Sequence, residues 1–340
     1  MAAAVTSGPG WVLGVDSGGS GLRVALAPAD APAHAVSTAS REPVRTGPGG
    51  IDAAHLLEQL LPMARTLLRR AAEAGAYGAA EAEAPGLVAV AIGAAGMATL
   101  GDDLRAVLPH ALAQALGVRR VALAADAVTA YAGALDQRPG AVVAAGTGMI
   151  ALGTDLTGWR RADGWGHLLG DCGGGAWIGR AGLEAAMRAH DGRRGGSAAL
   201  LERLEAVFGP AEELPGLLYP RSDRPALLAS FAPEVARCAA DDPVARSILA
   251  GAADDIAAAA AAVCPPASSG ECEVALTGGL FKMGDPLAVP LRAALAHQLP
   301  HARPVSAAGD PLAGSLTVAA ALATGSLRLP RHPRMLHVSL

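Results

Sequence analysis

Lysine is almost missing from this chain of 340 residues, because Lys282 is the only one. A P-loop needs the pattern G-x-x-x-x-G-K-[ST], and Lys282 stands in no such pattern, so that class of phosphate site is excluded. Any phosphate group would have to be held by backbone N–H groups, helix N-termini, arginine or a metal ion.

Cysteines, aromatic residues and charges are also scarce. The four cysteines include no C-x-x-C pair, which argues against a zinc site and a dithiol redox motif. Aromatic residues make up 3% of the chain and hydrophobic residues 51%, so the core must consist mainly of Ala, Val and Leu. A net charge of −4 without a basic tract argues against a nucleic-acid partner. No run is apolar enough for a membrane span, and the first residues are not typical of a signal peptide, so we expect a cytoplasmic protein without a membrane partner.

What the chain does contain is one pattern of elements used twice. We expect strands over residues 12–15, 22–27, 34–38, 87–92 and 121–125, and again over 141–145, 149–153, 158–162, 273–276 and 303–307. We expect helices over 51–74, 102–116, 287–299 and 312–324, with a helical middle over 176–263 that prolines interrupt. This order predicts a duplicated α/β domain with a cleft between the halves. The tail after Leu327 is rich in Arg and Pro, and we expect it to be loosely docked.

The segment Val12–Leu26 begins the first module. An apolar run ends at Asp16, the small residues Ser17–Gly21 follow, and a second apolar run leaves, which is typical of a β-hairpin. Such a turn exposes backbone N–H groups to an anion, and Asp16 could hold a hydrated Mg²⁺. An ordinary tight hairpin explains the same residues.

Two more small-residue turns follow strands, at Gly146–Gly148 and Thr277–Gly279. Three such turns suggest a nucleotide, with phosphates at the first two and the nucleoside near the third and Lys282. Residues 146–151 also match the dinucleotide fingerprint G-x-G-x-x-A, but that motif needs a helix next, and residues 150–155 are typical of a strand and turn.

Asp126 ends a run of apolar residues predicted as a buried strand, where a charge is costly unless it is used or paired. It could act as the general base that takes a proton from an attacking hydroxyl group. It could equally cap the helix that starts at about Ala127, and the two roles are compatible.

The segment Gly164–Gly175 is the least generic stretch, because six glycines surround Trp165, His167 and Asp171. A tryptophan face and a carboxylate are what a sugar ring requires, namely apolar stacking and hydrogen bonds to its polar groups. The alternative is a flexible linker that carries a tryptophan by chance.

Together these motifs resemble the superfamily of sugar kinases, hexokinase, actin and heat-shock chaperone ATPases. Within it they resemble the BadF/BadG/BcrA/BcrD ATPase-type family, which includes N-acetylglucosamine and glucosamine kinases. Residues 14–20 resemble its first phosphate motif, Gly146–Gly148 the second and Leu276–Leu280 the adenosine motif. The most specific element is Gly164-Trp165-Gly166-His167 with Gly170-Asp171, which is similar to an amino-sugar-kinase signature.

The resemblance implies two RNase H-like (actin-like ATPase) domains that close on ATP and a sugar, one formed by residues 1–127 plus 310–340 and one by residues 128–309 with a helical insertion. It implies that Asp126 is the base for the sugar 6-hydroxyl and that Asp16 holds Mg²⁺ through water. The implied ATP-binding residues are Ser17, Gly18, Gly19, Ser20, Gly146, Thr147, Gly148, Gly278, Gly279 and Lys282. The implied sugar-binding residues are Gly96, Gly164, Trp165, His167 and Asp171. A homodimer is expected on the same basis.

Two departures from the family pattern bear on the substrate. The second phosphate turn continues with Met149-Ile150 where N-acetylglucosamine kinases usually have Ser-Asn, and Asp171 is followed by Cys172-Gly173-Gly174 instead of Glu-Gly-Ser. A polar contact and an acid are therefore absent, and the glycines are expected to leave space near Asp171. A free amine is cationic and favours carboxylates, so D-glucosamine is predicted ahead of N-acetylglucosamine. An ATP-dependent dehydratase activator is a further alternative, but its paired cluster cysteines have no counterpart here. A sugar-sensing repressor would need a helix-turn-helix before the first strand, where only about ten residues stand.

Overall fold

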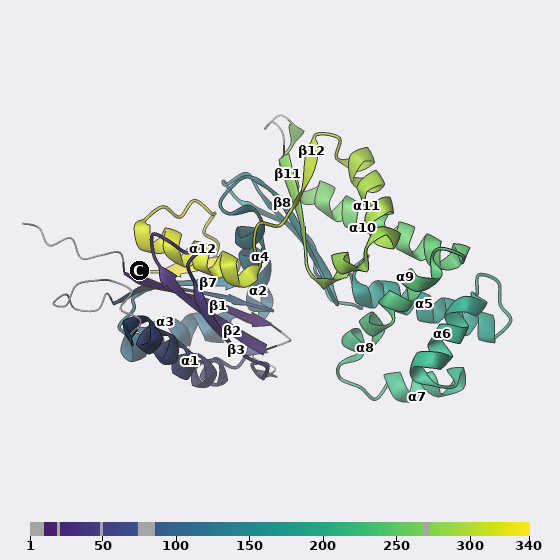
Figure 1. Cartoon of the computed structure of the whole chain (residues 1–340), viewed down its shortest axis with the longest axis horizontal. Helices are drawn as coiled ribbons and strands as arrows, with labels where there is room; N and C mark the ends of the chain where they lie inside the picture. Colours follow the sequence, from purple (N-terminus) through teal and green to yellow (C-terminus); the bar gives the residue numbers. More distant parts are fainter. Residues whose placement is uncertain (1–9, 19–20, 48–49, 74–85, 268–271) are drawn as a thin grey trace, which may run out of the picture. The chain divides into compact units, whose positions relative to one another are not determined.

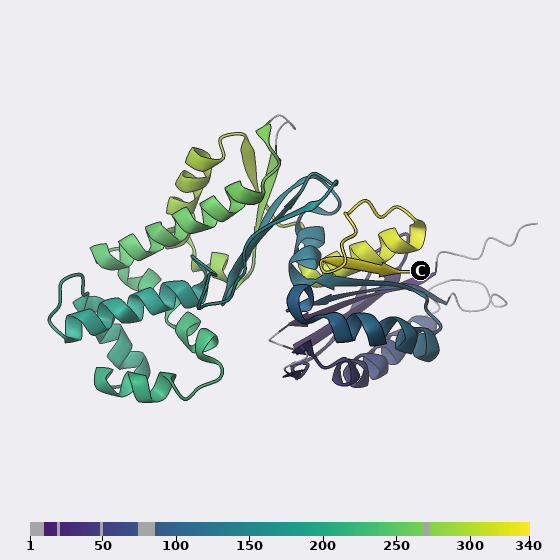
Figure 2. The same cartoon turned by 180° about the vertical axis from the view of Figure 1, so that it is seen from behind.

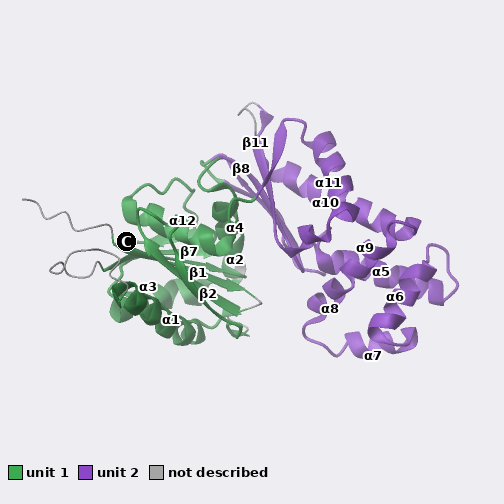
Figure 3. Ribbon diagram, viewed as in Figure 1, with its two compact units in different colours: residues 1–138, 156–158, 307–340 green, residues 139–155, 159–306 purple. Residues whose placement is uncertain are grey.

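The computed structural model describes residues 10–18, 21–47, 50–73, 86–267 and 272–340. The chain forms two compact units (Figure 3), the first comprising residues 1–138, 156–158 and 307–340 and the second residues 139–155 and 159–306. Helix Asp126–Leu135 therefore lies wholly in the first unit, whereas the sequence prediction placed the boundary at residue 127. In the described part of the chain no helix has the length and apolarity that a membrane span requires.

The first unit is a six-stranded sheet with helices on both faces. Its elements are β1 (Trp11–Gly18), β2 (Gly21–Pro28), β3 (Val36–Ser40), β4 (Thr46–Gly47), β5 (Gly50–Ile51), α1 (Ala53–Glu73), β6 (Leu87–Ala94), α2 (Met97–Leu100), α3 (Asp102–Leu116), β7 (Arg120–Ala125), α4 (Asp126–Leu135), α12 (Pro311–Thr324) and β13 (Leu336–Ser339). The strand order is β13-β7-β6-β1-β2-β3, in which β1, β6 and β7 run parallel and the hairpin β1–β2 is antiparallel. Helix α1 covers one face, and α12 and α4 cover the other (Figures 1 and 2).

The second unit repeats this topology. Its elements are β8 (Gly140–Ala145), β9 (Met149–Thr154), β10 (Trp159–Asp163), α5 (Gly175–His190), α6 (Ala198–Phe208), η1 (Ala211–Glu213), α7 (Leu214–Leu218), α8 (Arg224–Ser230), α9 (Ala232–Cys238), α10 (Pro243–Val263), β11 (Cys272–Thr277), η3 (Gly279–Met283), α11 (Asp285–Gln298) and β12 (Ala302–Ser306). The order β10-β9-β8-β11-β12 matches β3-β2-β1-β6-β7 of the first sheet strand for strand. The predicted fold class, a duplicated RNase H-like α/β domain, is confirmed.

Local sequence accounts for many of these elements. Apolar residues in α1 recur at Leu56, Leu60 and Leu67, and all three side chains are buried. Prolines 215, 225 and 233 stand in the first turns of α7, α8 and α9, where a missing N–H costs nothing, so they start helices as well as separating them.

Helix α12 packs closely on α4 and β1 because glycines allow it. A side chain at Gly314 would begin 1.9 Å from the Thr129 carbonyl oxygen, and one at Gly133 would begin 2.1 Å from that of Asp310. The Ser315 hydroxyl donates to the Val15 carbonyl oxygen at 2.8 Å, which fixes the helix on the first strand. The predicted return of the last helix to the first module is thus seen within that unit.

The expectation of a loosely docked tail is wrong. Strand β13 pairs antiparallel with β7, Leu336 is fully buried, and the Ala125 N–H donates to the Met335 carbonyl oxygen at 2.9 Å. Without β13, strand β7 would be an open sheet edge with unpaired backbone groups, so the tail pairs with it. The composition of the tail alone does not indicate this pairing. Elsewhere, a disulfide joins Cys264 at the end of α10 to Cys272 at the start of β11.

Candidate functional site

The first group of predicted site residues lies at one edge of the first sheet. Strands β1, β6 and β7 run parallel, with Asp16 level with Gly93, and Gly93 level with Ala124. Their carboxyl ends therefore bring Asp16, Ser17, Gly96 and Asp126 to the same edge, which is where α/β sheets bind ligands. Gly18 belongs to this group too, and a Cβ placed on it would meet nothing within 4 Å. Gly19 and Ser20 lie outside the described residues.

Asp16 is held by an arginine on the neighbouring strand. Arg23 donates to Asp16 Oδ2 from Nε at 3.0 Å and from Nη2 at 2.6 Å. Its Nη1 donates to Asp310 Oδ2 at 2.5 Å, and Asp310 also caps α12 through the Ala313 N–H. Burial alone would raise the pKa of Asp310, but the Ala313 N–H and the Arg23 guanidinium hold it below its usual value.

The Asp16 site fits a hydrated magnesium ion. Arg23 occupies Oδ2, and the side chain keeps 15% of its surface exposed. Mg²⁺ retains several waters and is usually bound through one or two carboxylates together with substrate phosphates. One carboxylate with an available oxygen meets that requirement. No group of three His, Cys, Asp or Glu residues in the described ranges is arranged to enclose a metal ion.

Asp126 is the first residue of α4, and its side chain is exposed. Its Oδ1 accepts the N–H of Ala127 at 2.9 Å, and its carbonyl oxygen accepts the Thr129 hydroxyl at 3.0 Å. The prediction that Asp126 caps this helix is therefore wrong: the helix starts one residue earlier than expected, its N-cap is Ala125, whose side chain makes no capping bond, and Asp126 is the first helical residue. An exposed carboxylate at the sheet edge remains suitable as a base.

In the second unit, two of the predicted turns meet. Gly146–Gly148 links β8 to β9, and Gly278 follows β11, the parallel neighbour of β8. Gly278 has a φ of 108°, and a Cβ on it would lie 2.2 Å from the Ala145 carbonyl oxygen, so only glycine suits this close approach. The first turn of α5 is tied to the same place, because the N–H groups of Gly175 and Ala176 donate to Gly146 and Thr147 carbonyl oxygens, both at 2.8 Å.

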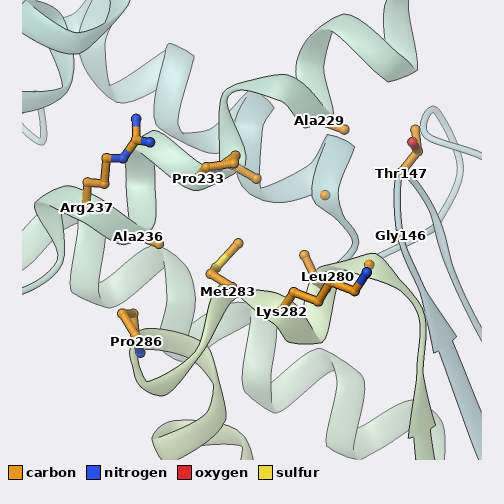
Figure 4. Close-up of a pocket in the computed structure, with 13 residues that line it drawn as sticks. Gly146, Thr147, Ala229, Pro233, Ala236, Arg237, Leu280, Lys282, Met283 and Pro286 are labelled. Atoms are coloured by element: carbon orange, nitrogen blue, oxygen red, sulfur yellow. The ribbon is translucent and has the colours of Figure 1, made fainter.

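These turns border a cavity of about 650 Å³ that lies within the second unit. Gly146 and Thr147 line one side, and α8 and α9 contribute the apolar residues Ala229, Ala232, Pro233 and Ala236. From the facing side, Lys282 and Met283 of η3 reach toward the cavity, as Figure 4 shows. The cavity thus combines apolar walls with a glycine turn and a cation, a combination suited to a nucleotide.

The glycine-rich segment after β10 is ordered rather than a linker. Asp163 accepts the N–H groups of Asp171 at 2.5 Å (Oδ1) and Cys172 at 2.9 Å (Oδ2), and Gly170 N–H donates to the Gly166 carbonyl oxygen at 2.8 Å. Trp165 remains 61% exposed, with the Arg161 guanidinium 4.3 Å from its ring centroid. A tryptophan face fixed from behind by a cation and open to solvent is suited to stack on a sugar.

Asp171 lies directly against the second phosphate turn. A Cβ on Gly148 would stand 2.2 Å from Asp171 Oδ2, while Asp171 Oδ1 accepts the Gly166 N–H at 3.0 Å. Burial raises the pKa of Asp171, the Gly166 N–H opposes this, the nearby Asp163 charge raises the pKa again, and His167 and Arg161 lower it. The structure therefore brings Gly148, Gly164, Trp165, His167 and Asp171 into one part of the second unit.

The expected open space beside Asp171 is not present. A Cβ on Gly173 would lie 2.6 Å from the Ala252 carbonyl oxygen, and one on Gly174 would lie 2.8 Å from the Gly148 carbonyl carbon. These glycines allow backbones to pack closely, which leaves no room for a larger substituent.

A model of the BadF/BadG/BcrA/BcrD ATPase family matches residues 13–289. The chain belongs to this family. The matched range includes every predicted site residue, and the family resemblance noted in the sequence is confirmed.

Comparisons with individual proteins are consistent with this family. The chain is 42% identical over 69 residues to the N-acetylmuramic acid/N-acetylglucosamine kinase of Clostridium acetobutylicum, an alignment that spans 20% of this chain and 22% of that enzyme. A Chromobacterium violaceum structure, provisionally named N-acetylglucosamine kinase, is 31% identical, with a TM-score of 0.61 over 90% of this chain and 97% of that one. The ROK hexokinase of Thermus thermophilus, at 19% identity, shares the fold with a TM-score of 0.54 over 92% of this chain and 98% of that one.

Two residues of the candidate site emerge only from the structure. Asp163 organises the glycine-rich segment, although a lone acid at a strand end is an ordinary surface residue in sequence. Arg237 lines the cavity and pairs with Glu234, which Arg203 also contacts at 2.6 Å. The spacing of Glu234 and Arg237, three apart on a helix, is the signal that could have indicated this pair.

Proposed function

We propose that this BadF-type ATPase is an ATP-dependent kinase that phosphorylates the 6-hydroxyl group of D-glucosamine. The observation that carries the proposal is the cavity of the second unit, where Gly146, Thr147 and Lys282 border an apolar chamber. Apolar walls suit a nucleobase and ribose, and the Gly146–Gly148 turn suits the phosphates. Lys282, which the sequence predicts at the nucleoside end, lines the same cavity and adds a positive charge to it. The names of the relatives support a sugar as the acceptor.

In the proposed reaction, Asp126 accepts the proton of the sugar hydroxyl as its oxygen bonds to the γ-phosphorus of ATP. The bond between that phosphorus and the β,γ-bridging oxygen breaks, which yields a sugar phosphate and ADP. Catalysis would depend mainly on positioning and on neutralising charge around the transferred group. Asp16 would hold the Mg²⁺ through water, and the ion would neutralise phosphate charge when bound.

The positive end of helix α5 supports a phosphate position near Gly146–Gly148. The helix begins at Gly175, and the N–H groups of Gly175 and Ala176 bond to carbonyl oxygens of the turn, so the helix would contribute its dipole rather than these two donors. A helix N-terminus favours negative charge, and a glycine turn lets the phosphates approach the backbone. Gly278 and Gly279, on the adjacent strand end, would then face the nucleoside.

The choice of aminosugar rests on the acids beside Trp165. Asp171 and Asp163 lie together, and Asp255 of α10 has a pKa raised by burial, by Asp163 and by Asp254. Such an acidic surrounding favours the ammonium group of glucosamine over a neutral acetamide. N-acetylglucosamine is the second candidate, because the relatives named above carry that substrate in their names.

The test is a panel of hexoses and aminosugars with ATP and Mg²⁺, measured by ADP release and by product mass. We expect glucosamine to give the highest kcat/KM, and Asp126→Asn to lower kcat by roughly 10²–10⁴-fold while ATP binding persists. Asp136→Asn, a change at the end of the same helix, serves as the control. ADP release that no sugar stimulates would refute the kinase proposal, and a preference for N-acetylglucosamine would refute the choice of sugar only.

A further inference from the structure

Asp163 is the last residue of β10, and its carboxylate joins the two ends of the glycine-rich segment. Asp163 Oδ1 accepts the N–H of Asp171 at 2.5 Å, and Oδ2 accepts the N–H of Cys172 at 2.9 Å. Each oxygen therefore binds a backbone group on the far side of the Trp165 loop. Hydrogen bonds to a carboxylate are about twice as strong as neutral ones, so each of these two bonds is stronger than the neutral bond between Gly170 N–H and the Gly166 carbonyl oxygen.

The backbone at both ends of this closure has an unusual conformation. Asp163 has a φ of 60° and Asp171 a φ of 55°, in the left-handed region that residues with a side chain rarely adopt. A Cβ on Gly170 would lie 2.3 Å from Asp163 Oδ1, so the segment passes directly over the carboxylate. This conformation persists only where surrounding contacts hold it, and Asp163 supplies two of them.

Arg161 secures the same turn from the other side. Its Nε donates to the Asp163 carbonyl oxygen at 3.0 Å, and its Nη2 donates to the Gly164 carbonyl oxygen at 2.5 Å. The same guanidinium lies against the Trp165 ring. The backbone of Asp163 thus positions the tryptophan through Arg161, while its side chain positions Asp171.

We propose that Asp163 is a positioning residue of the sugar site, which holds Trp165 and Asp171 in one closed loop so that an aminosugar meets both. This inference rests on the proposed function, because it takes these two residues to contact the sugar. Both carboxylate oxygens of Asp163 accept backbone N–H groups, so Asp163 acts on the sugar site through Trp165 and Asp171.

The principal experiment compares Asp163→Asn with the parent enzyme in the full chain. An asparagine keeps one acceptor oxygen but turns an NH₂ group toward a backbone N–H, so one contact is lost and one becomes repulsive. We expect KM for glucosamine to rise roughly ten- to hundredfold, while KM for ATP changes less than about threefold. Asp242→Asn is the matched control, because Asp242 also accepts a backbone N–H, that of Ala245, but caps α10 instead. A general loss of folding would lower kcat but would not raise KM for glucosamine while leaving KM for ATP nearly unchanged.

A second measurement does not depend on turnover. Burial and the Asp163 charge, with smaller effects of Asp255 and Asp171, raise the pKa of the Cys172 thiol and so suppress its thiolate. Asp163→Asn should open the loop and remove the charge, and both changes should speed the alkylation of Cys172 by iodoacetamide. The rate is measured by peptide mass spectrometry, with Cys238 as the internal reference.

The two measurements separate the two proposals. If the parent enzyme phosphorylates no sugar, the proposed function fails, and faster alkylation of Cys172 in Asp163→Asn would still support closure of the loop by Asp163. If the parent enzyme is active and Asp163→Asn leaves both KM for glucosamine and the Cys172 rate unchanged, the positioning role is overturned. An unchanged Cys172 rate overturns it even when the enzyme shows no activity.

Discussion

Gly148 offers a sharp test of the contact between the Gly146–Gly148 turn and Asp171, which are the proposed phosphate turn and a proposed sugar ligand. Gly148→Ala would place a Cβ 2.2 Å from Asp171 Oδ2 and 2.9 Å from Asp171 Cγ. Gly148 does not have a positive φ, so alanine is compatible with its backbone and the collision is the only cost. Ordinary contact begins at 3.4 Å, so the carboxylate must retreat by about 1 Å.

That displacement sets the expected size of the effect. A misplacement of about 1 Å can lower the rate by about 10²-fold, which corresponds to about 2.7 kcal/mol of transition-state stabilisation. Forcing an additional methyl group into a packed site lowers the free energy of unfolding by about 1–3 kcal/mol. We therefore expect Gly148→Ala to lower kcat/KM for glucosamine by about 10²-fold and to destabilise the protein.

The assays are steady-state kinetics with each substrate varied and chemical unfolding of the same samples. Gly216→Ala in α7 is the control, because a Cβ there meets nothing within 4 Å. Unfolding of Asp171→Ala with and without Gly148→Ala completes a double-mutant cycle. If the destabilisation by Gly148→Ala persists in full without the Asp171 carboxylate, or if glucosamine kinetics are unchanged, the steric reasoning is refuted.

Three further predictions concern other parts of the chain. Lys282→Met should raise KM for ATP roughly tenfold through loss of the positive charge that lines the cavity, and unchanged ATP kinetics would remove Lys282 from the site. Leu336→Ala should lower the free energy of unfolding by about 2–5 kcal/mol in denaturant titrations, because the side chain is fully buried; a loss below 1 kcal/mol would contradict the packing of β13. The pKa of Asp310 is lowered in the fold, so its stabilisation is complete above about pH 4 and declines as pH falls through the folded pKa. Arg23→Ala should therefore make the loss of thermal stability below about pH 4 shallower, and an identical acid profile would contradict this role of the ion pair.

Most strands of the two sheets could be predicted from sequence, and the inner strands β1, β6 and β8 are the clearest because each is a short apolar run that ends in small residues. The repeated order of hairpin, helix and strand was enough to predict the duplicated fold. Strand β13 could not be predicted, because its residues are of mixed polarity and it exists only through pairing with β7. Its formation depends on the tertiary fold rather than on local preference.

Within the candidate site, the glycine turns at Gly146–Gly148 and Gly278 could be predicted, because a small-residue turn after an apolar strand is a local sequence pattern. The structural role of a residue could not be predicted where that role depends on residues that are distant in sequence but adjacent in the fold. Glycine in sequence does not show whether a missing side chain leaves open space, as at Gly146, or admits another backbone, as at Gly173. Asp163 was missed for the same reason, because its two partners stand eight and nine residues further along the chain.

The discontinuity of the first unit has a consequence for how the protein is made. Helix α12 covers one face of the first sheet, yet it begins at Pro311, after the whole second unit has been synthesised. As the chain leaves the ribosome, that face of β1 and β6 can be covered only in part, by α4, whereas the second unit already has its own strands and helices. The second unit can therefore complete its core first, and the first unit is the part most in need of chaperone protection during translation.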